Sequence, residues 1–468
     1  MRLLHVAHAF PPESYAGVEV HTLGVARELR ARGHEVAVLH RSSGDEPWGL
    51  TESHVEDLLT FRLDNPLPYD SIDTSFHEPR VEHAFREAID RFRPDLVHFQ
   101  HLIHLSAHLP AVTDELGIPS LLTFHDYWYL CSRVQIYRPD DGRCAGPKIL
   151  RCARCLGGIV HVPPWMEVPA EWVGKRRGWT PARIERLGEP TLLGHVVRRR
   201  ERMIEWLSKP ALLIANSHHL RSRYLEALPI PPERIRMVRY GLDPAPFEDL
   251  PSRTDSPVLR LGYTGSLVEH KGLHVLIEAI RDLPGVTLDI FGADRGDPAV
   301  EAYAASLPRT DAIRFLGGYR QHEVGRLLRT IDVLVVPSIW EEAWGLIADE
   351  AFLAGVPVLA SRIGGLPEHV FDGHNGLLFH VGDAQDLRRQ IRWLIAKPER
   401  IDRLRAGIGE VRTLADNTGE LEELYRQAIA GDLRPPPQPS LWTTIRERLA
   451  EKRRSASVRD TGDDSAAT

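Results

Sequence analysis

Along most of this chain, short apolar segments alternate with longer segments whose apolar residues recur at helical spacing. The first unit opens with the apolar run "RLLHVAHAF" at residues 2–10, continues through a helical pattern at residues 18–34 and ends in "EVAVLHR" at residues 35–41. Gly33, near the end of the helical pattern, fits a helix C-terminus. Because strand, helix and strand in succession form a parallel pair with a right-handed crossover, this unit predicts a parallel sheet.

The same alternation recurs in two series, which a polar, proline-containing stretch at residues 244–257 separates. A chain of 468 residues exceeds what one hydrophobic core normally supports, which also favours two domains. We therefore predict two Rossmann-like, doubly wound α/β domains at residues 1–240 and 241–430, followed by a Pro-rich linker, a short helix and a disordered tail at 431–468. The further predicted strands lie at residues 94–100, 119–126, 210–217, 258–266, 286–293, 312–318, 331–338 and 356–361.

Composition and charge exclude several classes of function. The formal net charge is -7, whereas nonspecific binding of nucleic acid requires Lys and Arg in excess to neutralise phosphates, so no nucleic-acid partner is expected. The apolar runs are shorter than the roughly 20 residues that span a bilayer. The start of the chain fits a first buried strand better than a signal peptide, so a cytoplasmic location is expected.

A basic segment, "VVRRRERMIEW" at residues 196–206, allows two interpretations. It fits an amphipathic helix with a solvated charged face and a packed Trp and Ile side. The alternative is a patch that contacts a membrane surface, which leaves a membrane-peripheral location open. The surrounding residues 156–208 belong to neither series of strands and contain Trp165, Trp172 and Trp179.

The four cysteines of the chain, Cys131, Cys144, Cys152 and Cys155, lie within 25 residues, and the last two form a C-x-x-C pair. Because a cytosolic protein keeps its thiols reduced, the cluster favours a metal site over two disulfides or no joint role. Four thiolates can hold one tetrahedral structural Zn, whose closed shell leaves no position for catalysis. Such a Zn would order an insertion near residues 131–155 that has little apolar material of its own.

Two glutamates, Glu342 and Glu350, flank Trp344-Gly345 in "SIWEEAWGLIADEAFLAGVPVLAS", directly after a predicted strand. We expect a helix to begin near Gly345 or Leu346 and to carry Glu350 on its second turn. The free amides of a helix start admit phosphate or sugar oxygens, and carboxylates beside them can bind sugar hydroxyls. The spacing alone fits equally well a Glu342 that complements the helix dipole and a Glu350 on the surface.

The segment "PSIWEEAWGLIADEAFLAGVPVLASRIGGLPEHV" at residues 337–370 resembles the signature of retaining glycosyltransferases of family 4, in which two glutamates bracket an aromatic-Gly-Leu segment. The similarity extends through "AGVEVHTLGVARELRARGHEVAVL", "GSLVEHKGLHVLIEAI", "RFLGGY" and "GHNGLLF", and it covers most of residues 1–430. It implies the GT-B fold, in which two Rossmann-like domains face each other across a cleft. The C-terminal domain would hold most of the nucleotide-sugar donor, the N-terminal domain would hold most of the acceptor, and no catalytic metal would be needed.

The resemblance also implies roles for residues of the glutamate segment. Glu350 would bind the ribose hydroxyls of the donor, and Glu342 would lie beside the transferred sugar. The backbone amides that follow Trp344, those of Gly345 and Leu346, would contact the sugar and the diphosphate.

Three residues outside that segment match family positions. Lys271 would neutralise the diphosphate leaving group, a role suited to an ammonium in a closed cleft. Gly17 would let the first loop approach the donor, and His125 would lie over the donor sugar. One departure is Ser266, which stands where the family usually has Arg and removes one cation expected at the diphosphate.

The sequence thus predicts an enzyme of polysaccharide biosynthesis or a related pathway that transfers a sugar from a UDP- or GDP-sugar to a glycan, glycolipid or small-molecule acceptor, with retention of the anomeric configuration. The alternatives are a nucleotide-sugar epimerase of the same fold and a catalytically silent binding partner in a glycan-assembly complex. A dinucleotide-dependent oxidoreductase is disfavoured because no G-x-G-x-x-G follows the first strand.

Overall fold

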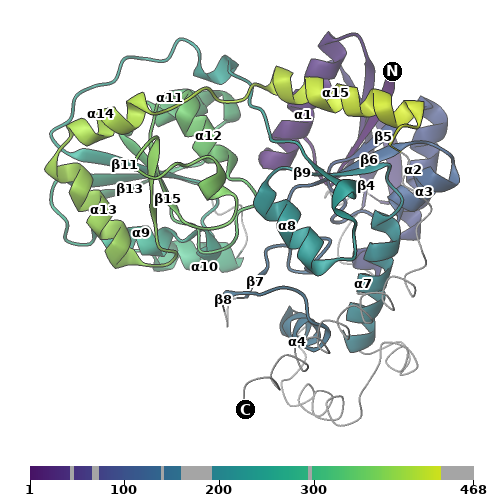
Figure 1. Ribbon diagram of the computed structural model, residues 1–468, viewed down its shortest axis with the longest axis horizontal. Helices are drawn as coiled ribbons and strands as arrows, with labels where there is room; N and C mark the ends of the chain where they lie inside the picture. Colours follow the sequence, from purple (N-terminus) through teal and green to yellow (C-terminus); the bar gives the residue numbers. More distant parts are fainter. Residues whose placement is uncertain (43–46, 66–72, 139–141, 160–191, 293–297, 434–468) are drawn as a thin grey trace, which may run out of the picture.

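The computed structural model describes residues 1–42, 47–65, 73–138, 142–159, 192–292 and 298–433. Two large sheets lie at the centres of two lobes, with helices around each (Figure 1). The predicted fold class, two doubly wound α/β domains, is confirmed. The change from one sheet to the other falls between strands β10 and β11.

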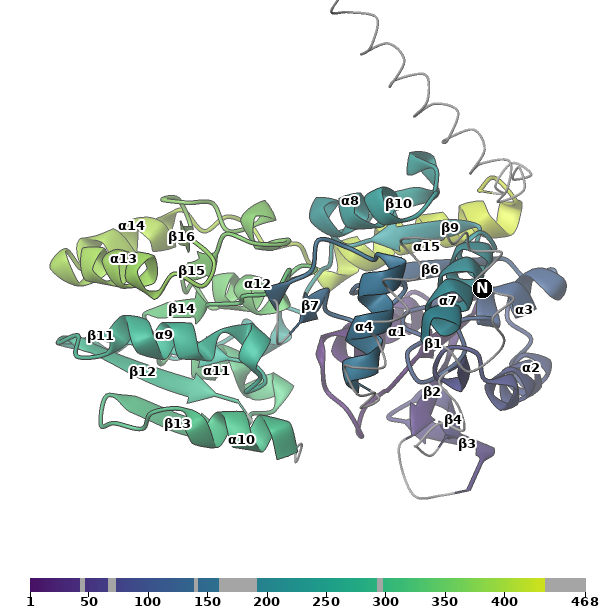
Figure 2. The same ribbon diagram turned by 90° about the horizontal axis from the view of Figure 1, so that it is seen from below.

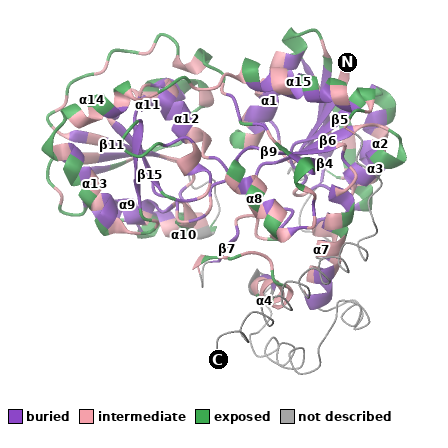
Figure 3. Ribbon diagram, viewed as in Figure 1, coloured by how far each residue is buried: buried purple, intermediate pink, exposed green. Residues whose placement is uncertain are grey.

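The N-terminal sheet has eight strands in the order β10-β9-β6-β5-β1-β2-β4-β3. Neighbouring strands are parallel, except that β3 and β4 form an antiparallel pair at one edge. The central strands are almost entirely buried (Figure 3), as expected where helices cover both faces of a parallel sheet. The strands are β1 Arg2–Ala7, β2 Glu35–Ser42, β3 Gly49–Val55, β4 Leu58–Asp64, β5 Leu96–Phe99, β6 Ser120–Phe124, β9 Leu212–Ala215 and β10 Ile235–Met237.

The helices of this lobe pack on both faces of the sheet because successive strand residues point to opposite sides. Leu3 belongs to the core beneath α1, whereas Leu4 belongs to the core beneath α2 and α3. Local signals fix the helix starts: the Glu78 side chain caps α2 and Pro79 takes its first position. The helices are α1 Gly17–Ala31, α2 Pro79–Phe92, α3 Leu109–Glu115, α4 Ile149–Ile159, α7 Leu192–Leu207 and α8 His218–Ala227, and a short pair, β7 Tyr137–Arg138 with β8 Gly142–Arg143, precedes α4.

The C-terminal sheet has six parallel strands in the order β13-β12-β11-β14-β15-β16. The strand order therefore reverses between β11 and β14. Figures 1 and 2 both place α12 on the side of this lobe that faces the other lobe. The elements are β11 Leu259–Thr264, α9 Leu273–Ile280, β12 Val286–Phe291, α10 Pro298–Ser306, β13 Ile313–Gly317, α11 Val324–Leu328, β14 Val333–Val336, α12 Leu346–Leu353, β15 Val358–Ser361, β16 Gly376–Phe379, α13 Ala384–Ala396 and α14 Glu399–Ala406.

The last described helix, α15 Leu414–Ala430, corrects one predicted domain boundary. It falls within the predicted C-terminal domain at residues 241–430, but it crosses to the N-terminal lobe and packs against α1 (Figure 1). Its buried residues Leu421, Leu424 and Tyr425 share a core with that lobe, and the Tyr425 hydroxyl lies 2.7 Å from His98 Nδ1. The apolar side chains of α15 pack into a core of the N-terminal lobe. Helical periodicity in the sequence shows which face of the helix is apolar but not which domain covers that face.

The basic segment at residues 196–206 lies on α7, and its arginines have partners within the protein. Arg198 contacts Asp73 at 2.9 Å, Arg199 is buried, and Arg200 donates to a backbone carbonyl. Three arginines of this segment are thus buried or bonded to other parts of the protein.

Within the described ranges, no helix is both long and apolar enough to cross a membrane. Trp165, Trp172 and Trp179 lie outside the described residues, and so do the linker, the helix and the tail predicted for residues 434–468.

Candidate active site

The two domains face each other across a cleft of about 1690 Å³ that residues of both domains line. On the C-terminal side, the lining comes largely from the loops after β11 and β14, where the strand order reverses. Ligands of doubly wound sheets bind at this reversal, beyond the carboxyl ends of the strands. On the N-terminal side, the lining includes the first turn of α1 and the residues after β6. The predicted site residues that line the cleft are Gly17, His125, Lys271, Glu342, Trp344, Gly345, Leu346 and Glu350.

Glu342 is held by three hydrogen-bond donors from two loops. Its Oε1 atom accepts from Lys271 Nζ at 2.7 Å, Ser338 Oγ at 2.6 Å and Trp340 Nε1 at 3.0 Å. Burial by itself raises the pKa of Glu342, but the charge of Lys271 and these hydrogen bonds outweigh burial and hold the pKa below its ordinary value. Glu342 is therefore an ionised carboxylate in a fixed position, and it holds the Lys271 ammonium at the cleft.

Two glycines allow this close packing of loops. Gly272 has a φ of 73°, and a Cβ there would lie 1.9 Å from the carbonyl oxygen of Pro337. Gly345 has a φ of 96°, and a Cβ there would lie 2.7 Å from Leu366 Cδ2. Only glycine fits both the conformation and the space at these positions.

Glu350 lies on the second turn of α12, which begins at Leu346 as the sequence predicted. Its Oε1 atom accepts a hydrogen bond from Gln321 Nε2 at 2.8 Å. Burial raises the pKa of Glu350 to about 7, the hydrogen bond from Gln321 opposes this shift, and the charge of Asp349 adds to it. Unlike Glu342, this carboxyl group has no cation beside it among the described residues, so it changes its charge near neutral pH.

The turn at Trp344 is braced from behind by a second buried cluster. His369 donates from Nδ1 to Asp349 at 2.7 Å and from Nε2 to the carbonyl of Trp344 at 3.0 Å. Its ring stacks on the indole of Trp344, which donates to the same Asp349 carboxylate at 2.6 Å. Although burial lowers the pKa of His369, Asp349 and the carbonyl of Trp344 outweigh burial and raise that pKa.

Of the predicted residues Gly17 and Ser266, only Gly17 lines the cleft. Gly17 begins α1, and a Cβ there would lie 3.3 Å from Leu346 Cδ1, so this glycine faces the start of α12. Ser266 does not line the cleft, and its carbonyl accepts a hydrogen bond from the Tyr263 hydroxyl at 2.8 Å. The side chain at position 266 therefore has no evident part in the site.

His125 lines the cleft, but both of its ring nitrogens have partners in the protein. Nε2 lies 2.9 Å from Gln100 Oε1, and Nδ1 contacts the Tyr240 hydroxyl. Burial, together with nearby histidines such as His21, holds the pKa of His125 well below its usual range. A neutral imidazole with both nitrogens engaged can shape the cleft but is poorly placed to transfer a proton.

The loop that carries Glu342 is held by the N-terminal domain through α8. Ser217 Oγ donates to the carbonyl of Ala343 at 2.6 Å, and Arg223 Nε lies 2.9 Å from Glu341 Oε2. Arg223 also donates to the carbonyl of Cys144 at 3.2 Å. Contacts thus run from the cysteine segment through Arg223 to the residue next to Glu342.

Replacing Arg223 with alanine is expected to lower kcat about tenfold, which corresponds to about 1.4 kcal/mol. The substitution leaves Glu341, which is largely buried, without its guanidinium partner and loosens the adjacent Glu342. Steady-state kinetics of donor turnover measure the effect. The control is Glu226→Ala, because Glu226 contacts Arg223 from the same helix and is exposed. Equal activity of Arg223→Ala and the control would contradict this role.

Glu19 is a candidate residue that sequence reasoning missed. It lies in the first turn of α1, lines the cleft and is 2% exposed. Its Oε1 accepts from the Ser14 hydroxyl at 3.0 Å, whereas Oε2 has no hydrogen-bond partner among the described residues. The sequence signal for Glu19 was its position two residues after Gly17. The roles of Gln321, Arg223 and His369 depend on contacts with distant segments, so the sequence gave no signal for them.

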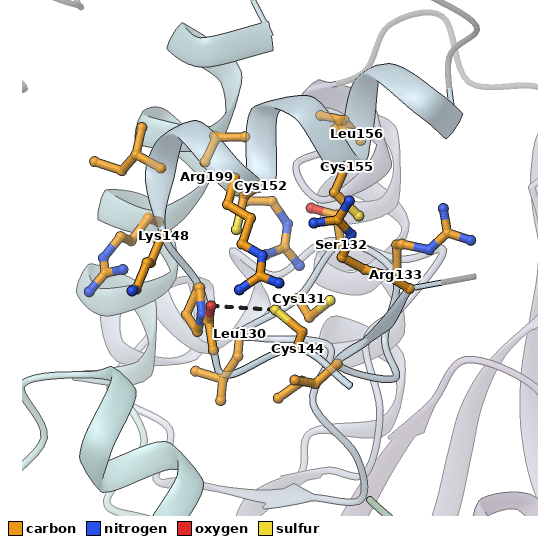
Figure 4. Close-up of a pocket in the computed structure, with 18 of the residues that line it drawn as sticks. Leu130, Cys131, Ser132, Arg133, Cys144, Lys148, Cys152, Cys155, Leu156 and Arg199 are labelled. Atoms are coloured by element: carbon orange, nitrogen blue, oxygen red, sulfur yellow. Dashed lines mark hydrogen bonds between the residues drawn. The ribbon is translucent and has the colours of Figure 1, made fainter. Parts of the chain in front are cut away.

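The four cysteines lie around one pocket beneath α4, with the Arg199 guanidinium among them (Figure 4). All four are free thiols. No three of these sulfur atoms, all of which the structure describes, lie within 4.8 Å of one another. Burial raises the pKa of Cys152 to about 11, with further contributions from the other thiols. The predicted ligands are thus gathered around one pocket, but they are not in a coordinating arrangement.

Comparison with known proteins identifies the family of this chain. The model of "Glycosyltransferase Family 4" matches residues 15–154, and the model of "Glycosyl transferases group 1" matches residues 248–408, so together they match more than half of the chain. The chain belongs to glycosyltransferase family 4. A glycogen synthase of Mycobacterium tuberculosis is 26% identical to this glycosyltransferase over 94% of its length and 97% of the relative. A D-inositol 3-phosphate glycosyltransferase of Stackebrandtia nassauensis is 28% identical over 53% and 62% of the respective chains.

Solved structures agree with the GT-B fold of this glycosyltransferase. Sucrose-phosphate synthase from Thermosynechococcus elongatus superposes with a TM-score of 0.63 at 18% identity, covering 92% of this chain and 99% of that one. HepE of Anabaena, solved with UDP and glucose, superposes with a TM-score of 0.59 at 16% identity, covering 91% and 99%. The protein is therefore a glycosyltransferase with the GT-B fold.

Proposed function

We propose that this glycosyltransferase transfers a hexosyl or related unit from a UDP- or GDP-sugar to a hydroxyl group of a glycan, glycolipid or small molecule, with retention of the anomeric configuration. The observation that carries the proposal is the ion pair between Lys271 and Glu342 at the strand-order reversal of the C-terminal sheet. It places a cation and a fixed carboxylate side by side where a donor diphosphate and its sugar would meet.

The donor contacts follow from this placement. Lys271 stabilises the negative charge that develops on the leaving diphosphate, and the amides of Gly345 and Leu346 at the start of α12 bind oxygens of the sugar or phosphate. Glu350 accepts hydrogen bonds from the ribose hydroxyls. Between the two donor classes, the similarity to HepE of Anabaena, which was solved with UDP and glucose, supports a UDP-sugar.

Retention is proposed to proceed by departure and attack on the same face of the sugar, with the leaving phosphate taking the acceptor proton. Glu342 does not serve as the nucleophile, because three donors already occupy its Oε1 and lower its basicity. Its charge instead stabilises positive charge on the sugar. On the acceptor side, Glu19 lines the cleft and helps to shape the place of the acceptor.

The test of the function is incubation with a panel of UDP- and GDP-sugars, followed by measurement of released nucleoside diphosphate. Slow hydrolysis of one donor without acceptor is expected, and NMR of the product formed with an accepted alcohol should show the donor's anomeric configuration. An inverted product would reject the mechanism. Isomerisation of the donor sugar without release would indicate an epimerase, and no turnover of any donor would indicate a silent binding partner.

The activity should depend on pH through Glu350. Burial raises the pKa of the Glu350 carboxyl group to about 7. Below that pH, Glu350 is therefore largely protonated in the free enzyme, and the ribose loses its charged hydrogen-bond acceptor. We therefore expect kcat/KM for the donor to rise with pH between about 6 and 8. The variant Glu350→Gln should lose this rise along with much of its donor affinity. A wild-type profile that is flat over this range would contradict the prediction.

We also propose that Cys131, Cys144, Cys152 and Cys155 bind one structural Zn, supported by their convergence on one pocket and opposed by their present spacing. The variant Cys152→Ser is expected to lose about one Zn per chain relative to wild type after purification without chelator, and to melt at a lower temperature. The control is Ser132→Ala, which changes the same pocket without removing a thiol. Unchanged Zn content and stability in Cys152→Ser would rule the site out.

A further inference from the structure

A second cluster of metal-binding side chains lies in the N-terminal domain, away from both the cleft and the cysteines. It consists of His77, which precedes α2, Glu82 on the first turns of α2, and His108, which precedes α3. Among the residues that the structure describes, these three alone form a group of at least three His, Cys, Asp or Glu side chains whose ligand atoms all lie within 4.8 Å of one another. None of them lines the cleft.

The spacing of the three side chains is close to that of a coordination shell. Glu82 presents one oxygen to each imidazole: Oε1 lies 3.1 Å from His77 Nε2, and Oε2 lies 3.0 Å from His108 Nδ1. In a tetrahedral Zn site with bonds of about 2.0 to 2.1 Å, neighbouring ligand atoms lie about 3.3 Å apart. Small side-chain rotations are therefore enough to seat an ion among these atoms.

Hydrogen bonding alone does not satisfy this cluster. His108 Nδ1 is buried and, despite its distance from Glu82, has no hydrogen-bond partner of acceptable geometry among the described residues. A buried nitrogen without a partner is costly, and a metal ion would remove that cost.

The surroundings hold the ligands in place. Ser106 Oγ donates to Glu82 Oε1 at 3.0 Å, the kind of outer contact that orients a ligating carboxylate. The ring of Trp206 on α7 lies against both imidazoles, with centroid distances of 5.2 Å to His77 and 5.1 Å to His108. The three ligands thus lie at the starts of α2 and α3, and α7 packs against them through Trp206.

We propose that His77, Glu82 and His108 form a binding site for one divalent transition-metal ion of the Zn class, with water completing its coordination. Two imidazoles and one carboxylate suit Zn, Co or Ni, whereas Mg and Ca prefer shells made entirely of oxygen. Because the site lies outside the cleft, its ion stabilises the N-terminal domain and takes no part in sugar transfer. This proposal does not depend on the proposed function.

The test is titration of chelator-treated protein with Zn²⁺ and with Co²⁺, in wild type, His108→Gln, Cys152→Ser and the double variant of the two. Calorimetry should show a binding event that persists in Cys152→Ser and weakens at least tenfold when His108→Gln is added to Cys152→Ser. The absorption spectrum of Co²⁺ at this site should lack the thiolate charge-transfer bands that a cysteine site produces. Added Zn²⁺ should raise the melting temperature of Cys152→Ser but not of the double variant Cys152→Ser, His108→Gln, because an ion that binds only the native state stabilises it.

A further variant covers the case in which His108→Gln folds poorly. His77 is more exposed than His108, so His77→Gln should fold normally while it also loses the ion. In the Cys152→Ser background, a folded protein that carries His77→Gln or His108→Gln and still binds Zn²⁺ as tightly as Cys152→Ser alone would overturn the proposal. Loss of all Zn²⁺ binding in Cys152→Ser would overturn it as well.

Discussion

Replacing Lys271 with alanine is expected to lower kcat/KM for the donor about 100- to 1000-fold, equal to about 2.7 to 4 kcal/mol of transition-state stabilisation. The physical reason is that Ser266 stands where family members usually have a cation, so Lys271 carries more of the charge that develops on the diphosphate. The measurement is steady-state release of nucleoside diphosphate from the preferred donor.

The control for this experiment is Lys209→Ala. Lys209 also forms an ion pair, with Asp114, but neither residue lines the cleft. Lys271→Ala also leaves Glu342 buried without its cation, so the double variant Lys271→Ala, Glu342→Gln should recover stability but not activity. If Lys271→Ala keeps more than half of wild-type turnover, the cation for the leaving group lies elsewhere.

Replacing Glu342 with glutamine should lower kcat, whereas the same change at Glu350 should mainly raise KM. Glu350 is assigned to the ribose, which does not react, so its contacts are nearly equal in the ground and transition states. Glu342 is assigned to the sugar, where positive charge develops, so removal of its charge should cost about 10²-fold in kcat.

The two glutamates serve as each other's control, because both lie in the cleft, both are buried and both undergo the same substitution. Both variants are to be measured at saturating donor and at a pH above 7, where Glu350 is mainly ionised in the wild type. A Glu342→Gln enzyme with normal kcat and raised KM would show that the roles of the pair are reversed.

Local patterns in the sequence were enough to predict the fold class, whereas the site residues were assigned from the resemblance to glycosyltransferase family 4. Strands such as β1 and β14 are short apolar runs, and their parallel pairing follows from the intervening helices. The start of α12 beside Trp344 and the position of Glu350 on its second turn followed from helix periodicity and the glycine before it. These features depend on residues that are near one another in the sequence, so periodicity and turn chemistry determine them.

Contacts between distant segments were decided only by the tertiary structure. The pairing of Lys271 with Glu342 and the hold of Arg223 on Glu341 bring together residues that are 71 and 118 positions apart. The packing of α15 on the N-terminal lobe depends on which of two apolar cores it fits best. Side-chain periodicity tells which face of an element is apolar but not which partner covers it, because that choice is made by packing and charge complementarity across the whole chain.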